Sequence, residues 1–391
     1  MILKMNNYFI EIGNKSIQKN GQQVCGDVFM SRKLQEEGRS VAVLSDGLGS
    51  GIKANVLATM TASMALNFTV ENQPIERSAQ SIRNTLPVDK DRKINYATFT
   101  ILDIEYDGET TILEYGNPQF LVFRAINSLE LKDIKESSDS ELKKGQFKAQ
   151  KEDRIILFSD GVSQSGMGRA DMPFGWDWED LKNFISYKLQ ADPYVSAENL
   201  SKIIVNRAYY NDSLKAKDDI TCSVIYFREP RNLIICTGPP YKLEKDKTMA
   251  QTIDGFNGAK IICGGTTAQI IARELEKDIE LDLFLGDGDL PPVSEMEGID
   301  LVTEGILTLG RASDWLEKKK PDEINYASPA GKIIHLFLKN DKITFLVGTR
   351  INEAHQDPAL PVELEIRRNV VKKLARILDD KYLKEVHIQY I

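Results

Sequence analysis

Histidine is scarce in this chain of 391 residues, and its only three copies stand at His335, His355 and His387. Chemistry in the first half therefore cannot use histidine as a base, a nucleophile or a metal ligand. The four cysteines include no Cys-x-x-Cys pair, which excludes the usual spacing of a zinc site and gives no sign of a disulfide framework. We therefore expect a reducing cytoplasm as the setting of the protein.

Long apolar runs are also missing, and no stretch approaches the length that spans a bilayer. Glu11 and Asn14 break the brief apolar run near the start, which is not typical of a signal peptide. The net charge of −8 disfavours nucleic acid and anionic membranes as partners, because both select basic surfaces. With 42% hydrophobic residues, the chain has the composition of a globular protein, and its length suggests two domains.

The first domain, residues 1–229, is predicted to be α+β. Strand-like segments follow one another closely, and Asp107-Gly108 marks a hairpin between 96–106 and 110–115. Apolar residues at helical spacing predict helices over 52–68 and 75–86. Consecutive hairpins with helices bunched between them indicate antiparallel sheets covered by helices. The charged segment 134–151 is expected to be an exposed excursion between strands.

The boundary is placed at Glu229-Pro230, because a strand–turn–helix rhythm begins after it. Residues 231–391 are therefore predicted to form a smaller α/β domain. Strands are expected at 233–236 and 260–263, and a helix at 362–378. Segments 332–338 and 343–347 are expected to pair as a hairpin around Asn340-Asp341.

Aspartates stand at the ends of several predicted strands. The segment Ser45–Gly51 (Ser-Asp-Gly-Leu-Gly-Ser-Gly) follows the apolar run 41–44, and Ser159-Asp160-Gly161 follows 155–158. Two further acidic motifs, Cys25-Gly26-Asp27 and Lys217–Thr221, complete a set of four. A single Asp-Gly motif is more often a turn. Four motifs at strand ends instead favour a common site.

Clustered aspartates repel one another, so a buried set needs cations or protons among its members. Hard divalent cations such as Mg²⁺ and Mn²⁺ prefer oxygen ligands, and the set requires no histidine. Two such ions can lower the pKa of a shared water and place it against phosphorus. The motifs therefore predict a two-metal site suited to phosphate chemistry.

In this order, the four motifs resemble the metal-dependent phosphatases of the phosphatase 2C type (the PPM superfamily). The glycine-rich second motif is similar to the bacterial SpoIIE (stage II sporulation protein E) family, and the resemblance covers residues 5–228. It implies a sandwich of two antiparallel sheets flanked by helices, α-β-β-α. It also implies two cations, Mn²⁺ or Mg²⁺, and hydrolysis of phosphoserine or phosphothreonine in a regulatory protein.

The resemblance assigns roles to individual residues. It implies that Asp46 bridges both cations, that the carbonyl of Gly47 contacts one of them, and that Asp160 and Asp218 hold the other. It further implies that Asp27 acts through water, and that Asp219 supports the site without binding a cation directly.

Other features around this site are less decisive. No arginine ahead of Asp27 suggests a phosphate-binding residue, and Lys15 and Lys19 are expected to be solvated. Cys25 has no histidine or arginine partner that would mark it as a nucleophile. The helices over 52–86 either form a switch, as in the family, or simply cover the sheet.

The second domain contains one candidate site, Gly264-Gly265-Thr266-Thr267, between a strand and a helix. Backbone amides there could bind an anion. The alternative is a glycine turn with Thr266 or Thr267 as the helix N-cap. We expect this domain to regulate the first or to recognise a partner.

The leading hypothesis is thus a cytoplasmic phosphoprotein phosphatase whose partner is its phosphorylated substrate, with a homodimer left open. The rival is a non-catalytic signalling module with the phosphatase fold, whose second domain senses a ligand. A third reading places nucleotide or other small-molecule chemistry in the second domain.

Overall fold

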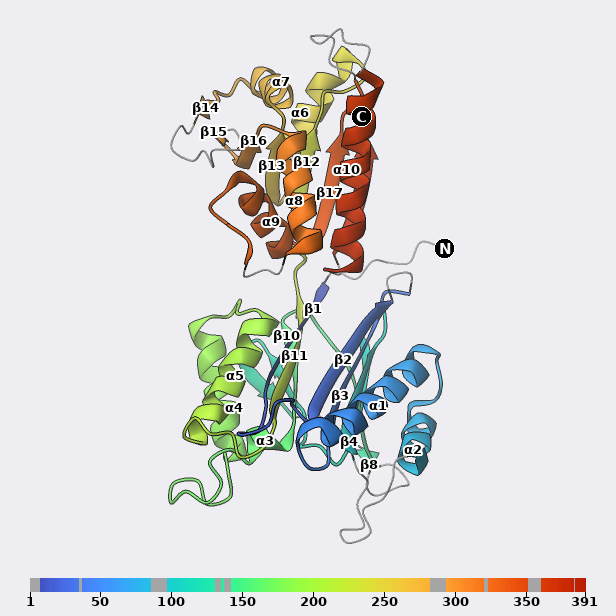
Figure 1. The fold of residues 1–391 in the computed structure, drawn as a ribbon, viewed down its shortest axis with the longest axis vertical. Coiled ribbons are helices and arrows are strands. Elements are labelled where there is room, and N and C mark those ends of the chain that lie inside the picture. The colour runs from blue at the N-terminus through green and yellow to red at the C-terminus, as the bar shows by residue number, and fades with distance from the viewer. Residues whose placement is uncertain are drawn as a thin grey trace. The chain divides into compact units, whose positions relative to one another are not determined.

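The computed structural model describes residues 8–34, 37–85, 97–130, 135–136, 142–281, 293–319, 323–350, 360–382 and 384–391. Contacts between Cα atoms divide the chain into two compact units, Met1–Glu229 and Pro230–Ile391. Each unit has its own sheets and its own hydrophobic cores (Figure 1).

The first unit contains two antiparallel sheets, ordered β1-β11-β10-β6-β7 and β2-β3-β4-β5-β9-β8. The strands of the first sheet are β1 (Phe9–Ile17), β6 (Leu121–Arg124), β7 (Asn127–Leu129), β10 (Asp153–Phe158) and β11 (Ile220–Arg228). Those of the second are β2 (Asp27–Leu34), β3 (Arg39–Gly47), β4 (Ala97–Ile104), β5 (Glu109–Tyr115), β8 (Lys135–Glu136) and β9 (Leu142–Lys148). The helices are α1 (Gly51–Val70), α2 (Ile75–Thr85), α3 (Asp160–Ser163), α4 (Trp178–Ala191) and α5 (Ala197–Asn211).

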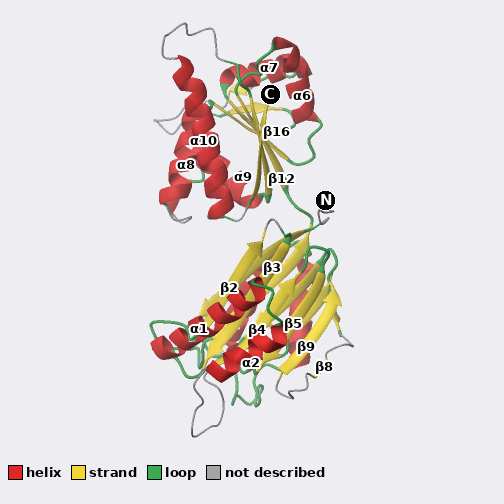
Figure 2. Ribbon diagram, turned by 90° about the vertical axis from the view of Figure 1, so that its right-hand side faces the viewer, coloured by secondary structure: helices red, strands yellow, loops and turns green. Residues whose placement is uncertain are grey.

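Three apolar layers hold this unit together. One lies between the two sheets and includes Leu44, Leu102 and Ile225. The second lies beneath α1 and α2, and the third beneath α4 and α5. Helices thus cover the outer face of each sheet (Figures 1 and 2), which confirms the expected α-β-β-α sandwich.

The second unit is built around one mixed sheet, ordered β14-β15-β16-β13-β12-β17-β18. Its strands are β12 (Asn232–Thr237), β13 (Ala259–Cys263), β14 (Glu280–Leu281), β15 (Ser294–Met296), β16 (Ile299–Thr303), β17 (Lys342–Val347) and β18 (Glu385–Tyr390). Its helices are η1 (Leu243–Lys245), α6 (Asp246–Asp254), α7 (Gly265–Leu275), α8 (Ile306–Lys318), α9 (Pro329–Lys339) and α10 (Leu360–Asp380).

Five neighbouring strands of this sheet, from β16 to β18, are parallel. Across the sheet these strands lie in the order β16, β13, β12, β17 and β18, so the third strand along the chain lies at one side and the fifth at the other. The order third, second, first, fourth and fifth is that of a doubly wound α/β fold. Figure 2 shows α6 and α7 on one face of the sheet and α8, α9 and α10 on the other. Separate apolar clusters fill the two faces, so the expected α/β character of this unit is confirmed.

Two local predictions are wrong. Residues 332–338 lie in α9, not in a hairpin strand. Ser328 caps the helix through Gly331, Pro329 occupies its first turn, and Ile333, Ile334 and Phe337 share its buried face. In the segment 134–151, residues 142–148 form β9, which pairs with β5 along its whole length.

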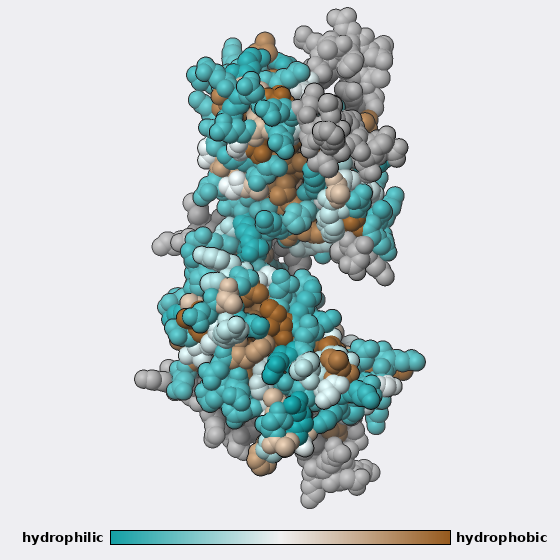
Figure 3. All heavy atoms as spheres, turned by 90° about the vertical axis from the view of Figure 1, so that its left-hand side faces the viewer, coloured by the Kyte–Doolittle hydropathy of each residue, from teal (hydrophilic) through white to brown (hydrophobic). Residues whose placement is uncertain are grey.

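Hydrophilic side chains cover most of the face shown in Figure 3, with hydrophobic residues scattered among them. Within the described residues, no helix is both long enough and apolar enough to cross a membrane.

Candidate metal centre

The pairing of β2 with β3 places the first two aspartates opposite each other. Asp27 is the first residue of β2, and its partner in the antiparallel register is Asp46, next to the end of β3. The Asp27 side chain is buried and that of Asp46 is half-buried. One edge of the second sheet therefore carries two facing carboxylates.

The other sheet brings two more aspartates to the same place. Asp160 follows β10 as the first residue of α3, and Asp218 lies just before β11. Because β10 and β11 are antiparallel neighbours, the end of one lies beside the start of the other. Asp46 interacts electrostatically with Asp27, Asp160 and Asp218. The four predicted carboxylates thus gather at one end of the sandwich.

Two glycines allow the close packing around them. A Cβ atom on Gly47 would lie 2.1 Å from the carbonyl oxygen of Ala54 in α1. A Cβ atom on Gly161 would lie 2.0 Å from the carbonyl oxygen of Asp219. Neither position can hold a side chain without moving the backbone, so the glycine of each Ser-Asp-Gly motif is required by packing.

Ser159 joins the two halves of the site. Its hydroxyl donates to Oδ2 of Asp27 at 2.7 Å and accepts from the backbone N–H of Thr221 at 3.0 Å. The other carboxylate oxygen of Asp27, Oδ1, is buried and has no hydrogen-bond partner in the described structure. The sequence motif contained Ser159, but nothing in it indicated this contact with Asp27.

Burial and mutual repulsion change the acidity of these groups. Burial raises the pKa of Asp27 well above its ordinary value, and the nearby Asp219 and Asp160 raise it further. Burial raises the pKa of Asp46 even more, with added repulsion from Asp27, Asp160 and Asp218. The pKa of Asp160 is also raised, first by burial and then by Asp218. Such a group holds protons unless a cation replaces them.

This donor set fits a divalent cation. It supplies only oxygen ligands, its negative charge is incompletely neutralised, and one buried carboxylate oxygen lacks a partner. However, no three acidic, cysteine or histidine side chains in the described part of the chain already converge as a metal cage. Asp160 accepts from Gln164 at 2.9 Å, and Asp218 faces Lys19. Binding would therefore require these side chains to turn from their present partners.

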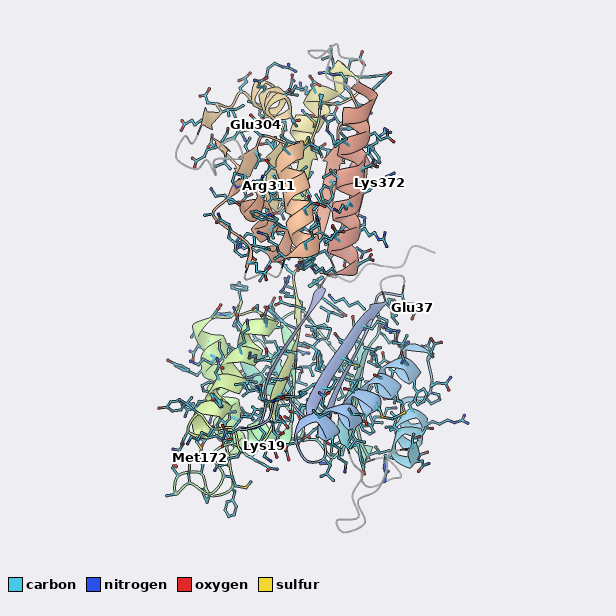
Figure 4. All side chains as sticks on the ribbon, in the orientation of Figure 1. Lys19, Glu37, Met172, Glu304, Arg311 and Lys372 are labelled. Atoms are coloured by element: carbon cyan, nitrogen blue, oxygen red, sulfur yellow. The ribbon has the colours of Figure 1, made fainter. Side chains whose placement is uncertain are left out.

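Lys19 is the cation nearest to Asp218 in the described structure. Its Nζ lies 3.5 Å from Oδ1 of Asp218, and its backbone N–H donates to Oδ1 of Asp219 at 2.9 Å. Figure 4 shows Lys19 in the segment between β1 and β2. The expectation that Lys19 is only solvated is therefore incomplete. Its place depends on β1 pairing with β11, a contact that local sequence cannot reveal.

The remaining predicted residues have clear positions. Asp219 is buried beneath the site. Burial, followed by repulsion from Asp27 and Asp219, raises the pKa of the Cys25 thiol to about 12, so this thiol is protonated at neutral pH. This agrees with the expectation that Cys25 is not a nucleophile.

The Gly264–Thr267 segment belongs to the second unit. Its helix, α7, begins at Gly265 and has Gly264 as its N-cap, with no side-chain cap. The alternative in which Thr266 or Thr267 caps the helix is therefore wrong, because both threonines lie inside its first turn.

The folded first unit defines a class: a two-sheet α-β-β-α sandwich of the phosphatase 2C type. Residues 36–228 match the model of the stage II sporulation protein E (SpoIIE) family. The first unit is accordingly SpoIIE-like. No curated protein matches the chain.

Several solved structures are similar to part of this chain. One contains the phosphatase domain and a regulatory fragment of SpoIIE from Bacillus subtilis, at 18% identity and a TM-score of 0.47, covering 56% of this chain and 64% of that one. Another contains the RsbU and RsbW domains of Rv1364c from Mycobacterium tuberculosis, at 15% identity and a TM-score of 0.47, covering 64% and 68%. A structure of RsbX in complex with magnesium has 18% identity and a TM-score of 0.40, covering 57% and 98%.

Proposed function

We propose that the first unit hydrolyses phosphoserine or phosphothreonine in a regulatory protein, with two divalent cations, Mn²⁺ or Mg²⁺. The observation that carries this proposal is the gathering of four aspartates from both sheets at one end of a SpoIIE-like domain. Bound cations would activate a water molecule and neutralise charge on the phosphoryl oxygens.

Each residue has a distinct task in this proposal. Asp46 would contact both cations, since it faces the other three aspartates. The carbonyl of Gly47 would serve one cation, and Asp160 and Asp218 the other. Asp27 would act through water, held in place by Ser159, while Asp219 positions the backbone of Lys19.

Lys19 would add positive charge on the substrate side of the site. Its ammonium group and the Asp218 carboxylate are both more than one-third exposed, so their ion pair is screened by solvent and easily exchanged. When a cation holds Asp218, the ammonium group becomes available to a phosphoryl oxygen.

We infer that α1 couples the site to its surroundings. Near its start, Ala54 packs on Gly47, and the side chain of Asn55 donates to the carbonyl of Cys25 at 2.8 Å. Near its end, Arg39 donates to the carbonyl of Thr69 at 2.8 Å while it pairs with Asp103. A shift of α1 would therefore move the backbone beside Asp46, which favours the switch over simple cover.

The second unit is proposed to regulate the first or to recognise a partner. This rests only on its attachment to a SpoIIE-like domain. A cytoplasmic setting is supported by four cysteines that are all free thiols.

The direct test is Mn²⁺-dependent hydrolysis of a phosphoserine peptide by Asp46→Asn and Asp218→Asn. Both variants should lose activity while their circular dichroism stays unchanged. Asp180→Asn, at an exposed position on α4, is the matched control and should keep full activity. Full activity in both site variants would contradict the proposal. Absence of both hydrolysis and metal binding in the unaltered protein would favour the non-catalytic signalling module.

A further inference from the structure

Two adjacent parallel strands of the second unit send their connections to opposite faces of the sheet. β13 and β16 are paired up to Cys263 and Thr303. After β13 the chain enters α7, which packs on the face that also carries α6. After β16 it enters α8, which packs on the face of α9 and α10 (Figure 2). Ligands of open α/β sheets bind beyond the carboxyl ends of the strands, and the ends of β13 and β16 both lie on that side.

The two helices begin side by side. Gly264 is the N-cap of α7 and Gly305 is the N-cap of α8, with φ angles of +123° and +122°. A Cβ atom on Gly305 would lie 3.1 Å from Cα of Gly264, and the N–H of Gly264 donates to Thr303 at 2.8 Å. The amino ends of both helices therefore meet at one junction, which only residues without a side chain can form.

The backbone donors at this junction have no partners. In α7 the first helical hydrogen bond is donated by the N–H of Ala268 to the carbonyl of Gly264, and in α8 by the N–H of Leu309 to the carbonyl of Gly305. The N–H groups of residues 265–267 and 306–308 make no hydrogen bond within the described structure. Neither helix has a side-chain cap or an acidic residue in its first turn. Side chains cap the helices that start after Asp177, Ser196 and Ser328, whereas α1, α3 and α6 also begin without a side-chain cap.

The first turn of α8 also contains a buried hydroxyl, that of Thr308. Thr308 is the third residue of α8, its side chain is 0% exposed, and its Oγ1 has no partner in the described residues. Side chains on a helix lean toward its amino end, so the Thr308 side chain lies over the turn that begins with Gly305. Leaving it unpaired destabilises the fold unless a ligand satisfies it.

The junction thus combines unpaired backbone N–H groups from two helix starts with an unpaired hydroxyl on the first turn of α8. We propose that it binds the phosphoryl group of a small molecule. Backbone N–H groups and the positive ends of two helix dipoles would face the phosphoryl oxygens. A Cβ atom on Gly265 would have no neighbour within 4 Å, so there is space next to these donors.

One charged side chain lies at the junction and another farther along α8. Glu304 precedes Gly305 and is exposed, and Arg311 lies about one and a half turns along α8 (Figure 4). Glu304 opposes an anion, whereas Arg311 favours one. The backbone donors and the Thr308 hydroxyl must therefore supply specific binding.

The first experiment removes one backbone donor. Proline is well tolerated in the first position of a helix, so Gly265→Pro deletes an N–H while α7 stays intact. Gly265→Ala adds a side chain in the same open space and keeps the N–H, which makes it the matched control. Calorimetric titrations use the full chain with EDTA, so that no divalent cation can attract phosphate to the first unit. The probes are inorganic phosphate, AMP and phosphoserine.

We expect saturable binding of at least one probe by the unaltered chain and by Gly265→Ala, and roughly tenfold weaker binding by Gly265→Pro. Preference for AMP would identify a nucleotide as the source of the phosphoryl group, and equal affinity for inorganic phosphate would identify the free ion. Binding of none of the three probes, or equal binding by both variants, would overturn the proposal.

The second experiment separates a binding role of Thr308 from a structural one. Thr308→Val removes the unpaired hydroxyl at nearly constant shape, so it should leave the free protein at least as thermally stable as before. The same variant should weaken phosphate binding roughly tenfold, and Thr308→Ser should restore it. Glu304→Gln should tighten binding by removing a repulsive charge. Unchanged affinity in Thr308→Val would contradict the assignment, and the phosphatase proposal would be unaffected.

Discussion

The two units gather polar groups of opposite charge: carboxylates in the first unit and backbone N–H donors in the second. The first gathers four carboxylates at the ends of antiparallel strands, and burial together with mutual repulsion raises the pKa values of Asp27, Asp46 and Asp160. The second gathers backbone N–H groups at the amino ends of two helices, with no acidic side chain in either first turn. Each arrangement would be balanced by a ligand of the opposite charge. On the two proposals above, the same chain would bind cations at one place and an anion at another.

The units also differ in how they create these places. In the first, side chains supply the charge, and glycines only allow the backbone to approach. In the second, glycines form the junction themselves and the backbone supplies the donors. Substitutions should therefore act through lost side-chain chemistry in the first unit and through changed backbone chemistry in the second.

Among variants that keep every proposed cation ligand, Ser159→Ala should weaken the site of the first unit most. Ser159→Ala would leave Oδ2 of Asp27 without its hydroxyl donor, and Oδ1 already lacks a partner. We expect Mn²⁺ affinity, measured by calorimetry, to fall about 10–100-fold, as when groups that orient ligands are lost. Ser163→Ala, one turn further along in α3, is the control. Equal Mn²⁺ affinity in both variants would show that Ser159 does not orient Asp27.

Gly47→Ala tests whether packing beside Asp46 is as tight as the structure indicates. The new Cβ atom would meet the carbonyl of Ala54 at 2.1 Å, which forces α1 away from the sheet. We expect the free energy of unfolding to fall by about 1–3 kcal/mol, together with loss of hydrolysis. Gly49→Ala would not serve as the control, because φ at Gly49 is +103°. Gly265→Ala, in open space, is suitable, and urea denaturation of the two variants gives the comparison.

Glu114 provides a buried carboxylate outside both sites. Burial raises its pKa from 4.5 to about 8, although it accepts a hydrogen bond from the N–H of Phe120 at 2.7 Å. The folded protein therefore keeps this proton where the unfolded chain has lost it. The stabilisation that comes from the protonated Glu114 is complete below pH 4.5 and disappears as the pH rises toward about 8.

Glu114→Gln should remove this part of the pH dependence. Between pH 5 and pH 8, the unaltered chain should lose at least about 1 kcal/mol more unfolding free energy than the variant. Urea denaturation at both pH values provides the measurement. Parallel pH dependence in the two proteins would show that Glu114 ionises normally in the folded state.

Lys19→Met should have the smallest effect, because the ion pair with Asp218 is exposed to solvent. We expect KM for a phosphoserine peptide to rise by roughly threefold to tenfold with little change in thermal stability. Lys19→Arg should recover most of the affinity. If KM is unchanged in Lys19→Met, the lysine neutralises Asp218 without contacting substrate.

Much of the first unit can be predicted from the sequence, because its strand ends and turns are marked by short motifs of neighbouring residues. An apolar run followed by Ser-Asp-Gly marks both a strand end and the position of a carboxylate, and the hairpin at Asp107-Gly108 formed as expected. The family resemblance supplied the sandwich of the two sheets. The contacts of Lys19 and Ser159 could not be predicted, because they arise from pairing between strands far apart in the chain.

The second unit was harder to predict for the same reason. The apolar run of α9 predicts a strand as readily as a helix, because Ile, Leu and Phe are common in both, although Ser328 and Pro329 mark a helix start. Gly264 belongs to a glycine-rich turn that is visible in the local sequence. Gly305 has no such local signal, because only the parallel pairing of β13 with β16 brings the two glycines together.

Calorimetric titration of the full chain with Mn²⁺ tests the central claim most directly, that the four aspartates form a cation site. The account predicts saturable binding by the unaltered protein and by Asp180→Asn. Asp46→Asn should bind far more weakly, beyond the 10–100-fold expected from losing a group that only orients ligands. Equal Mn²⁺ binding by Asp46→Asn and the unaltered protein would contradict the account.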